Sequence, residues 1–255
     1  MGYEERIIAF VDILGFKAIV NGNNAEKVKE ILTIPKNYFY NQPIKKYRNI
    51  QISLFSDSII ISFLYTEEHA VYNLLLDLQN ILIEFIYKGV VCRGFIKKGN
   101  VYHDQNFLFG PAFNEAYDFE KKMKYPKIGF DNDIYTIGCK YHDPKKTERQ
   151  EDIFLRTLFI KDNDNTYYID YLFTPISSVR NVKTVYRKEY LLKLLEITNN
   201  GLMNLDPLIR EKYEWVKLKF YSVLDSLLNF SDEMYNEIIK DISKKEIQEI
   251  RNKIL

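Results

Sequence analysis

The stretch Asn49–Phe63, NIQISLFSDSIIISF, decides the fold of this chain. Its two halves are alternating or continuous runs of apolar, largely β-branched residues, a pattern typical of β-strands. Between them lies the short polar break Phe55-Ser56-Asp57-Ser58. The stretch therefore predicts a hairpin, with strands over about 49–55 and 58–64 and with Asp57 at its tip.

Two explanations fit an acidic residue at the tip of two apolar strands. Aspartate is common in turns because its carboxylate bonds to the nearby backbone. Alternatively, Asp57 is a metal ligand that the hairpin presents at the edge of a sheet. The hairpin by itself favours turn chemistry, and the rest of the chain has to decide between the two.

The composition is that of a globular protein with no general affinity for polyanions. The chain has 255 residues, of which 46% are hydrophobic and 28% are charged, enough for one large domain or two small ones. Because the formal net charge is only +1, neither nucleic acid nor an anionic membrane is expected as a partner. The 20 Tyr and 17 Phe residues follow core periodicities rather than a basic stripe, which argues against base stacking of the RNA-binding kind.

Cysteine and histidine give no sign of a metal centre or of disulfide bonds. Cys92 and Cys139 are too few and too isolated for a disulfide framework or a zinc site. His69, His103 and His142 share no ligand spacing, and we expect them to be surface residues or hydrogen-bonded polar residues.

No targeting or membrane segment is expected. The N-terminus, MGYEERIIAFVD, carries acidic residues early and lacks the basic and apolar regions of a secretory signal. The most apolar helical stretch, LLLDLQNILIEFI over 74–86, is interrupted by Asp77, Gln79, Asn80 and Glu84, so it is not a spanning segment. We therefore expect a cytoplasmic protein.

The elements around the hairpin predict an α+β fold. Residues 6–13 read as a buried strand that ends at 14–16, and 90–98 as another, while helical patterns run from there to about residue 40 and over 67–88. Asn24 is a plausible helix cap, Pro35 is expected to break or kink the first helix, and Gly99-Asn100 to end the last strand in a turn. The order β-α-β-β-α-β is that of the ferredoxin-like fold with a mixed, largely antiparallel sheet.

This topology brings two carboxylates together. Right-handed crossovers place the first strand between the third and the fourth, antiparallel to the third. The end of the first strand, with Asp12, then lies beside the start of the third, with Asp57, which favours the metal-ligand explanation. Mg²⁺ prefers oxygen ligands, and two such ions can activate an attacking oxygen and stabilise a leaving phosphate.

The loop after Asp12 adds a place for phosphates. Ile13, Leu14, Gly15 and Phe16 lead into a helix whose free N–H groups could hold phosphate oxygens. Together with the two carboxylates, this predicts nucleoside triphosphate binding and metal-assisted phosphoryl transfer.

The chain changes character towards its C-terminus. An extended piece at 106–109 and Gly110-Pro111 lead into a helix over 112–124, followed by a strand at 127–130, a charged loop at 141–152 and a hairpin formed by 153–160 and 167–172. Three helical segments follow at about 181–198, 207–229 and 231–250. We expect a catalytic-type domain over 1–178 and a helical extension over 179–255.

Four blocks of sequence resemble the class III nucleotidyl cyclases. They are FVDILGF (10–16), LFSDSIIISF (54–63), CRGFIKKGNVYHD (92–104) and FGPAFNEAYDFE (109–120). Within that family they are most similar to the pyrimidine cyclases of the Pycsar anti-phage systems. The blocks occur in the family's order and spacing, and the resemblance covers roughly residues 5–175.

The resemblance implies roles for individual residues. It implies that Asp12 and Asp57, with the carbonyl of Ile13, hold two Mg²⁺ or Mn²⁺ ions per active site. It implies an antiparallel homodimer with both active sites at the interface. Asn114 matches the asparagine that orients the substrate ribose from the other subunit, although it could also be an ordinary residue of a helix surface.

Three positions depart from the purine cyclases of this family. Asp118 stands where they carry a transition-state arginine, Ser53 where a lysine reads the base, and Phe107 where a second polar residue does so. The purine-reading pair is thus absent, which is compatible with a pyrimidine substrate. Arg93, Lys97, Lys121 and Lys122 are candidate replacements for the arginine, although such residues are more often solvated surface charges.

Two classes of function follow, with a weaker third. The first is a cyclase that converts UTP or CTP into the 3′,5′-cyclic mononucleotide as a second messenger in anti-phage defence. The second is a binding or regulatory module that has kept the fold and lost turnover. Asp118 favours the module, and the paired carboxylates favour the enzyme. A polymerase-palm dinucleotide cyclase would carry a double acid or Gly-Gly at the hairpin, and residues 55–58 do not.

Overall fold

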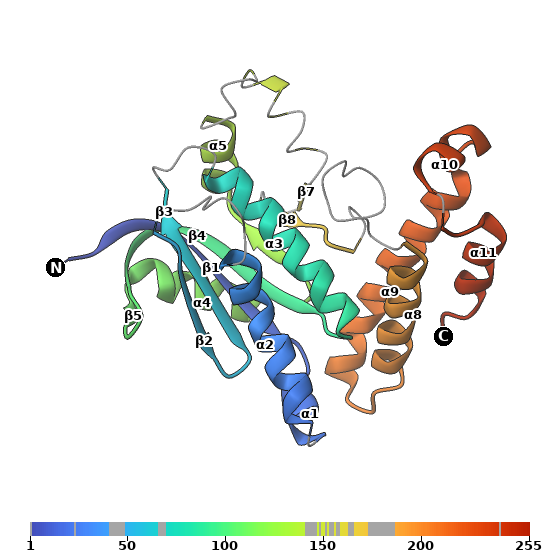
Figure 1. The fold of residues 1–255 in the computed structure, drawn as a ribbon, viewed down its shortest axis with the longest axis horizontal. Coiled ribbons are helices and arrows are strands. Elements are labelled where there is room, and N and C mark those ends of the chain that lie inside the picture. The colour runs from blue at the N-terminus through green and yellow to red at the C-terminus, as the bar shows by residue number, and fades with distance from the viewer. Residues whose placement is uncertain are drawn as a thin grey trace. The chain divides into compact units, whose positions relative to one another are not determined.

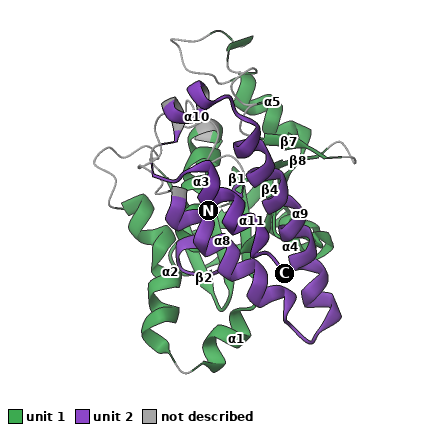
Figure 2. Ribbon diagram, turned by 90° about the vertical axis from the view of Figure 1, so that its right-hand side faces the viewer, with its two compact units in different colours: residues 1–85, 91–170 green, residues 86–90, 171–255 purple. Residues whose placement is uncertain are grey.

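The structure is a computed structural model that divides into two compact units. It describes residues 2–22, 24–40, 49–65, 70–140, 147, 149–150, 152, 156, 159–162, 166–172, 187–239 and 241–255. Unit 1 comprises residues 1–85 and 91–170, and unit 2 comprises residues 86–90 and 171–255 (Figure 2). The boundary predicted near residue 178 lies outside the described residues.

Unit 1 is built on one mixed sheet with the strand order β2-β3-β1-β4-β6-β8-β7 (Figure 1). All the pairings are antiparallel except that of β4 with β6, and β5 pairs with the end of β4. The strands are β1 (Glu4–Ile13), β2 (Gln51–Phe55), β3 (Ser58–Leu64), β4 (Cys92–His103), β5 (Leu108–Phe109), β6 (Ile128–Phe130), β7 (Phe159–Lys161) and β8 (Tyr167–Ile169).

In the described residues of unit 1, five helices accompany the sheet. They are α1 (Phe16–Asn21), α2 (Ala25–Tyr40), α3 (Ala70–Tyr87, whose last two residues belong to unit 2), α4 (Pro111–Lys122) and α5 (Asn132–Lys140). In Figure 1, α2 and α3 lie on one face of the central strands and α4 lies on the other.

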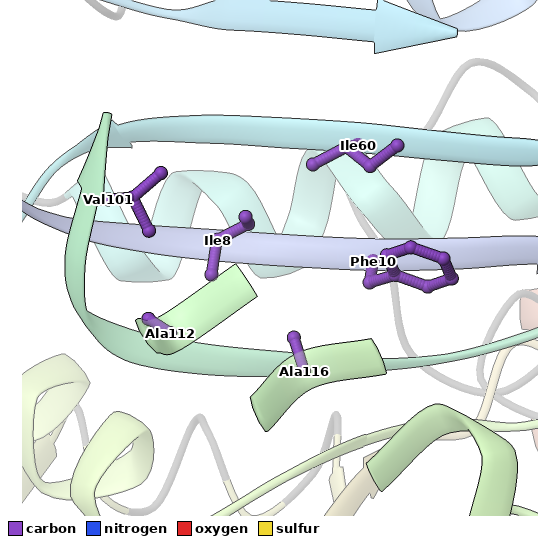
Figure 3. Packing of buried hydrophobic residues seen from close by; sticks show 6 residues of the cluster. All are labelled: Ile8, Phe10, Ile60, Val101, Ala112 and Ala116. Carbon is purple, nitrogen blue, oxygen red and sulfur yellow. The ribbon is translucent and has the colours of Figure 1, made fainter. Parts of the chain in front are cut away.

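The two faces of the sheet differ in what they carry. Because side chains alternate along a strand, Ile7, Ala9 and Val11 of β1 lie on the face opposite to α4, and all three are buried. On the α4 face, an apolar cluster joins three strands to two alanines of α4 (Figure 3). Its members are Ile8, Phe10, Ile60, Val101, Ala112 and Ala116. Polar residues lie on this face on either side of the cluster.

The core predicted from the sequence is confirmed. The first strand lies between the third and the fourth, and the hairpin has the predicted strands. The predicted α+β class, with a mixed sheet and C-terminal helices, is also confirmed. Asn24 caps α2, since its Oδ1 accepts from the N–H of Lys27 at 2.9 Å.

The predicted turn at Gly99-Asn100 is wrong, because β4 continues through it to His103. Glu5 pairs with Asn100 and Arg6 with Gly99, so the long first strand keeps its partner extended. A Cβ at Gly99 would lie 3.0 Å from the Cβ of Ala112, so this glycine serves close packing against α4 rather than a turn.

Three helices also differ from prediction. Helix α2 is not broken at Pro35, and the chain breaks earlier, at Gly22. Helix α5 was not predicted, and its N-terminus is held by Asp131, whose Oδ1 accepts from the N–H of Ile134 at 3.3 Å. The predicted segment 231–250 is two helices, and Ser243 begins the second with a capping box to Glu246.

Unit 2 is helical. Its helices are α8 (Arg187–Leu202), α9 (Pro207–Asn229), α10 (Asp232–Ile238) and α11 (Lys244–Asn252). Helices α8 and α9 meet closely, because a Cβ at Gly201 would overlap the ring of Tyr213. Arg251 on α11 pairs with Asp225 on α9 at 2.7 Å. In the part of the chain that the structure describes, no helix has both the length and the apolar character needed to cross a bilayer.

Candidate functional site

Asp12 and Asp57 meet at one end of the α4 face. Asp12 pairs with Ser58 across the β1–β3 ladder, and the N–H of Ile13 donates to the carbonyl oxygen of Asp57 at 3.0 Å. The hairpin turn is tight because Ser56 adopts a φ of 55°, which few non-glycine residues do. The backbone of the hairpin tip is thus bonded to the end of β1, with the two carboxylate residues as neighbours.

Arg93 on β4 lies beside this pair. Its register partner on β1 is Asp12, and its Nε is 3.2 Å from Asp12 Oδ2. The same Nε is 2.5 Å from Glu120 Oε1, and Nη1 donates to the carbonyl of Met123 at 3.2 Å. One guanidinium therefore joins a strand end to the end of α4.

Glu120 is a buried carboxylate that the sequence reasoning did not assign. It follows Ala112 and Ala116 on the α4 row that faces the sheet, and it is 3% exposed. Burial raises the pKa of Glu120, the Arg93 guanidinium lowers it, and the Asp12 and Asp57 carboxylates raise it further. Its signal in the sequence was an acidic residue at a core position of an amphipathic helix.

The charges here fit a divalent cation. Arg93 pairs with Asp12 and Glu120, and the Asp57 carboxylate adds a third negative charge that acts on Glu120, so Arg93 alone does not balance the local negative charge. Over the described residues, no group of three or more His, Cys, Asp or Glu side chains forms a metal site. Two carboxylates suffice for Mg²⁺ or Mn²⁺ when water and substrate phosphates complete the shell.

The loop after Asp12 has fewer amides to offer than expected. The N–H of Ile13 is bonded to Asp57 and that of Leu14 to the carbonyl of Val91 at 3.0 Å. Gly15 adopts a left-handed conformation with φ of 75°, and Phe16, which is buried, begins α1. In this loop, only the backbone N–H groups from Gly15 onward could donate hydrogen bonds to a phosphate.

Asn114 lies on the exposed side of α4. It is two positions from Ala112 and from Ala116, which face the sheet, so it points away from Asp12 of its own chain. Asp118, one helical turn later, is also exposed. The structure therefore does not bring Asn114 together with the carboxylate pair within one chain.

Ser53 contacts His103, and Phe107 lies in the turn that follows His103. Ser53 Oγ lies 2.9 Å from His103 Nε2, and His103 pairs with Leu108, the residue after Phe107. Phe107 is 62% exposed and lines a hollow of about 480 Å³. The other residues that line this hollow are Gly2, Tyr3, Tyr102 and Phe109. His103 itself was expected to be a surface or hydrogen-bonded polar residue, and the structure places it in a buried network.

The lysines proposed as replacements for the arginine have other contacts. Lys97 pairs with Asp131 at 2.6 Å and with Glu115 at 3.6 Å. Lys121 lies 4.0 Å from the ring centroid of Tyr117, and Lys122 lies 5.3 Å from that of Phe119. Of the four candidate cations, Arg93 is the one that contacts Asp12.

No family model matches the sequence, and no curated protein matches it. The fold is similar to several solved structures at low identity. A bacterial light-regulated adenylyl cyclase shares 13% identity at a TM-score of 0.42, over 77% of this chain and 100% of that one. The adenylyl cyclase CyaB from P. aeruginosa shares 13% at 0.43, over 71% and 98%. The guanylate cyclase domain of RhGC from Catenaria anguillulae, in complex with GTP, shares 16% at 0.41, over 66% and 97%.

Proposed function

We propose that this chain is a nucleotidyl cyclase that converts UTP or CTP into the 3′,5′-cyclic mononucleotide and diphosphate. The observation that carries the proposal is the hydrogen bond from the Ile13 amide to the Asp57 carbonyl, together with the pairing of Asp12 with Ser58. These contacts make neighbours of two carboxylates from separate sequence blocks, both of which resemble the cyclase family. A second messenger in anti-phage defence is the role that this resemblance suggests.

The roles of the residues around the carboxylates follow from their positions. Asp12, Asp57 and the carbonyl of Ile13 would hold two Mg²⁺ or Mn²⁺ ions. When bound, these ions lower the pKa of the ribose 3′ hydroxyl and neutralise the departing diphosphate. Arg93 lies beside Asp12, where its guanidinium could donate N–H hydrogen bonds to phosphate oxygens. The amides of Gly15 and Phe16 would hold the remaining phosphate oxygens.

A pyrimidine base is supported by the residues at the base-contacting positions. Strong rejection of a wrong base requires paired polar groups that the right base satisfies. Here Ser53 offers one short hydroxyl, and Phe107 offers a ring with no hydrogen-bonding group. An aromatic ring in place of a polar reader leaves less room for a purine and fits a smaller base.

The position of Asn114 supports a homodimer. Asn114 is exposed and lies on the side of α4 away from the sheet, so it does not serve the carboxylate pair of its own chain. In a symmetric dimer, the same surface of each chain meets its copy. Each active site would then take its metal ligands from one chain and Asn114 from the other.

The deciding experiment is to incubate the pure protein with each of the four nucleoside triphosphates and Mn²⁺, and then to separate the products. We expect cyclic UMP as the main product, with cyclic CMP second. Cyclic AMP or cyclic GMP as the main product would contradict the pocket argument. The rate should be low, because a missing transition-state arginine costs roughly 10³–10⁵-fold in phosphoryl transfer where it has been measured.

One observation favours the second candidate, a nucleotide-binding module without turnover. The family's arginine position is occupied by the exposed Asp118, and Arg93 is engaged by Asp12 and Glu120. If this candidate is right, the four triphosphates give no product with Mn²⁺, while equilibrium dialysis still detects a bound nucleotide.

A further inference from the structure

A buried polar network lies on the α4 face beyond the apolar cluster, away from Asp12. Arg6 on β1 donates through Nε to Ser62 Oγ at 2.9 Å, and Ser62 Oγ lies 2.8 Å from His103 Nδ1. His103 Nε2 lies 2.9 Å from Ser53 Oγ on β2. Arg6 is 2% exposed, His103 is 6% exposed and Ser62 is fully buried. Four strands thus contribute to one continuous chain of hydrogen bonds.

The guanidinium fixes one end of this chain. Arg6 carries only donors, and besides Ser62 Oγ it donates to the Ser62 carbonyl at 3.2 Å, to Glu4 Oε2 at 2.7 Å and to the carbonyl of Asn49. Because Ser62 Oγ accepts from Arg6, its own hydrogen is available for His103 Nδ1. If Nδ1 carried the ring proton instead, Ser62 would accept twice and its buried hydroxyl hydrogen would have no acceptor among these groups.

The tautomer of the His103 ring then sets the direction of the hydrogen bond to Ser53. With Nδ1 accepting, the proton of the neutral ring is on Nε2, which donates to Ser53 Oγ. A doubly protonated ring is disfavoured, since burial and the charge of Arg6 lower the pKa of His103 to about 4, against a smaller opposing effect of Asp104. Ser53 is half-buried on the edge strand β2, and its hydroxyl hydrogen is directed away from His103.

We propose that Arg6, Ser62 and His103 are positioning residues that make Ser53 a hydrogen-bond donor to the base, so that the site prefers uracil to cytosine. The inference rests on the proposed function and names the substrate that this function leaves open. The 4-carbonyl of uracil accepts the Ser53 hydrogen. The 4-amino group of cytosine is itself a donor, so Ser53 would accept from it and keep its own hydrogen unpaired.

The test uses nucleotides that bind without reacting. 3′-deoxy-UTP and 3′-deoxy-CTP lack the attacking hydroxyl, and their dissociation constants with Mn²⁺ are measured by calorimetry. We expect the wild type to bind 3′-deoxy-UTP about tenfold more tightly, the effect of one neutral hydrogen bond. The ratio should fall towards one in Ser53→Ala and in His103→Phe, and stay near ten in Ser53→Thr, which keeps the hydroxyl.

Controls separate this inference from a structural role and from the proposed function. His103→Gln is a polar second variant in case His103→Phe does not fold, and it too should lower the ratio. Equal weakening of both nucleotides, with an unchanged ratio, would show that the network only supports the fold and would overturn the inference. A ratio that shifts as expected in a protein without cyclic product would leave the inference standing and reject turnover. Failure to bind either nucleotide would overturn both.

Discussion

The two polar regions of the α4 face differ in how fully their charges are balanced. Arg6 and Asp12, which belong to one region each, are six residues apart on β1, about 20 Å along a strand. In the region around Asp12, the Arg93 guanidinium pairs with two carboxylates, Asp57 adds a third negative charge, and the buried Glu120 has a raised pKa. In the region around Arg6, each of Arg6, Ser53, Ser62 and His103 hydrogen-bonds to a residue of another strand.

This difference separates two kinds of function on one sheet face. Unbalanced charge at a partly exposed strand end is a place where a cation and a polyanionic ligand gain the most. A buried network whose members already bond to one another cannot bind a new charge at low cost, but it can fix the direction of one hydroxyl at its end. We therefore assign the metal-assisted reaction to the region around Asp12 and base selection to the region around Arg6. The following predictions test that division.

The largest effect is expected from the carboxylates. Asp12→Ala and Asp57→Ala should each lower turnover by at least about 10³-fold, because each would remove a ligand of the ions that activate the attacking oxygen. Both residues lie at strand ends, so thermal unfolding should change little. The matched control is Asp133→Ala, an exposed aspartate in the first turn of α5, which should keep full turnover. Wild-type turnover in either Asp12→Ala or Asp57→Ala would remove the metal assignment.

The second prediction concerns whether one chain alone forms a complete active site. Asp57→Ala and Asn114→Ala chains, each inactive alone, are mixed, unfolded and refolded together. If sites are shared in a symmetric dimer, about a quarter of wild-type turnover returns, because half of the dimers carry one intact site of two. Light scattering on the wild type should show a dimer. A monomer that is fully active would contradict both the assembly and the role of Asn114.

Much of this division could be predicted from the sequence, because its elements depend on local pattern. The β-branched runs of 49–63 gave the hairpin, and the βαββαβ order placed Asp12 beside Asp57 through topology alone. The prediction of a turn at Gly99-Asn100 was wrong because Gly99 allows close packing against Ala112. A sequence pattern cannot distinguish such a glycine from one in a turn.

The Arg6 network could not be predicted, because it depends on register across four strands. Arg6, Ser53, Ser62 and His103 belong to four separate segments of the sequence, and no local pattern links them. Only the alignment of strands shows that all four share one face, and a slip of one residue would reverse any of them. The pairing of Glu120 with Arg93 was missed for a similar reason, since a helix and a strand far apart in sequence supply it.

The third effect is on stability and tests the coupling around Arg93. Arg93→Met leaves Glu120 buried without its cation, and the free energy of unfolding should fall by about 3 kcal/mol. Adding Glu120→Leu removes the unpaired charge and should restore most of this loss. Urea unfolding at pH 7 measures both. Lys98→Met, which breaks the more exposed pair with Glu5, is the control and should cost less than about 1 kcal/mol.

The smallest effect concerns the second region and its pH dependence. The pKa of His103 is lowered to about 4 in the fold, whereas an unfolded histidine titrates near 6.5. Above pH 6.5 neither the folded nor the unfolded state binds the proton, and His103 contributes no pH dependence. Between 6.5 and 4 the unfolded state binds a proton that the folded state does not. The free energy of unfolding should therefore fall as the pH falls, by roughly 2–3 kcal/mol across this window.

Urea unfolding at pH 7.5 and pH 4.5 measures this loss, and comparison of variants isolates His103. Carboxylate titrations are common to all variants and cancel in the difference, so His103→Gln should lose roughly 2 kcal/mol less than the wild type. Ser53→Ala leaves the ring buried, bonded to Ser62 and exposed to the charge of Arg6, so its loss should match that of the wild type. Equal losses in wild type and His103→Gln would mean that the ring accepts a proton in the fold. Ser53 would then face a ring that donates from both nitrogens, and the contrast between a balanced region and an unbalanced one would no longer hold.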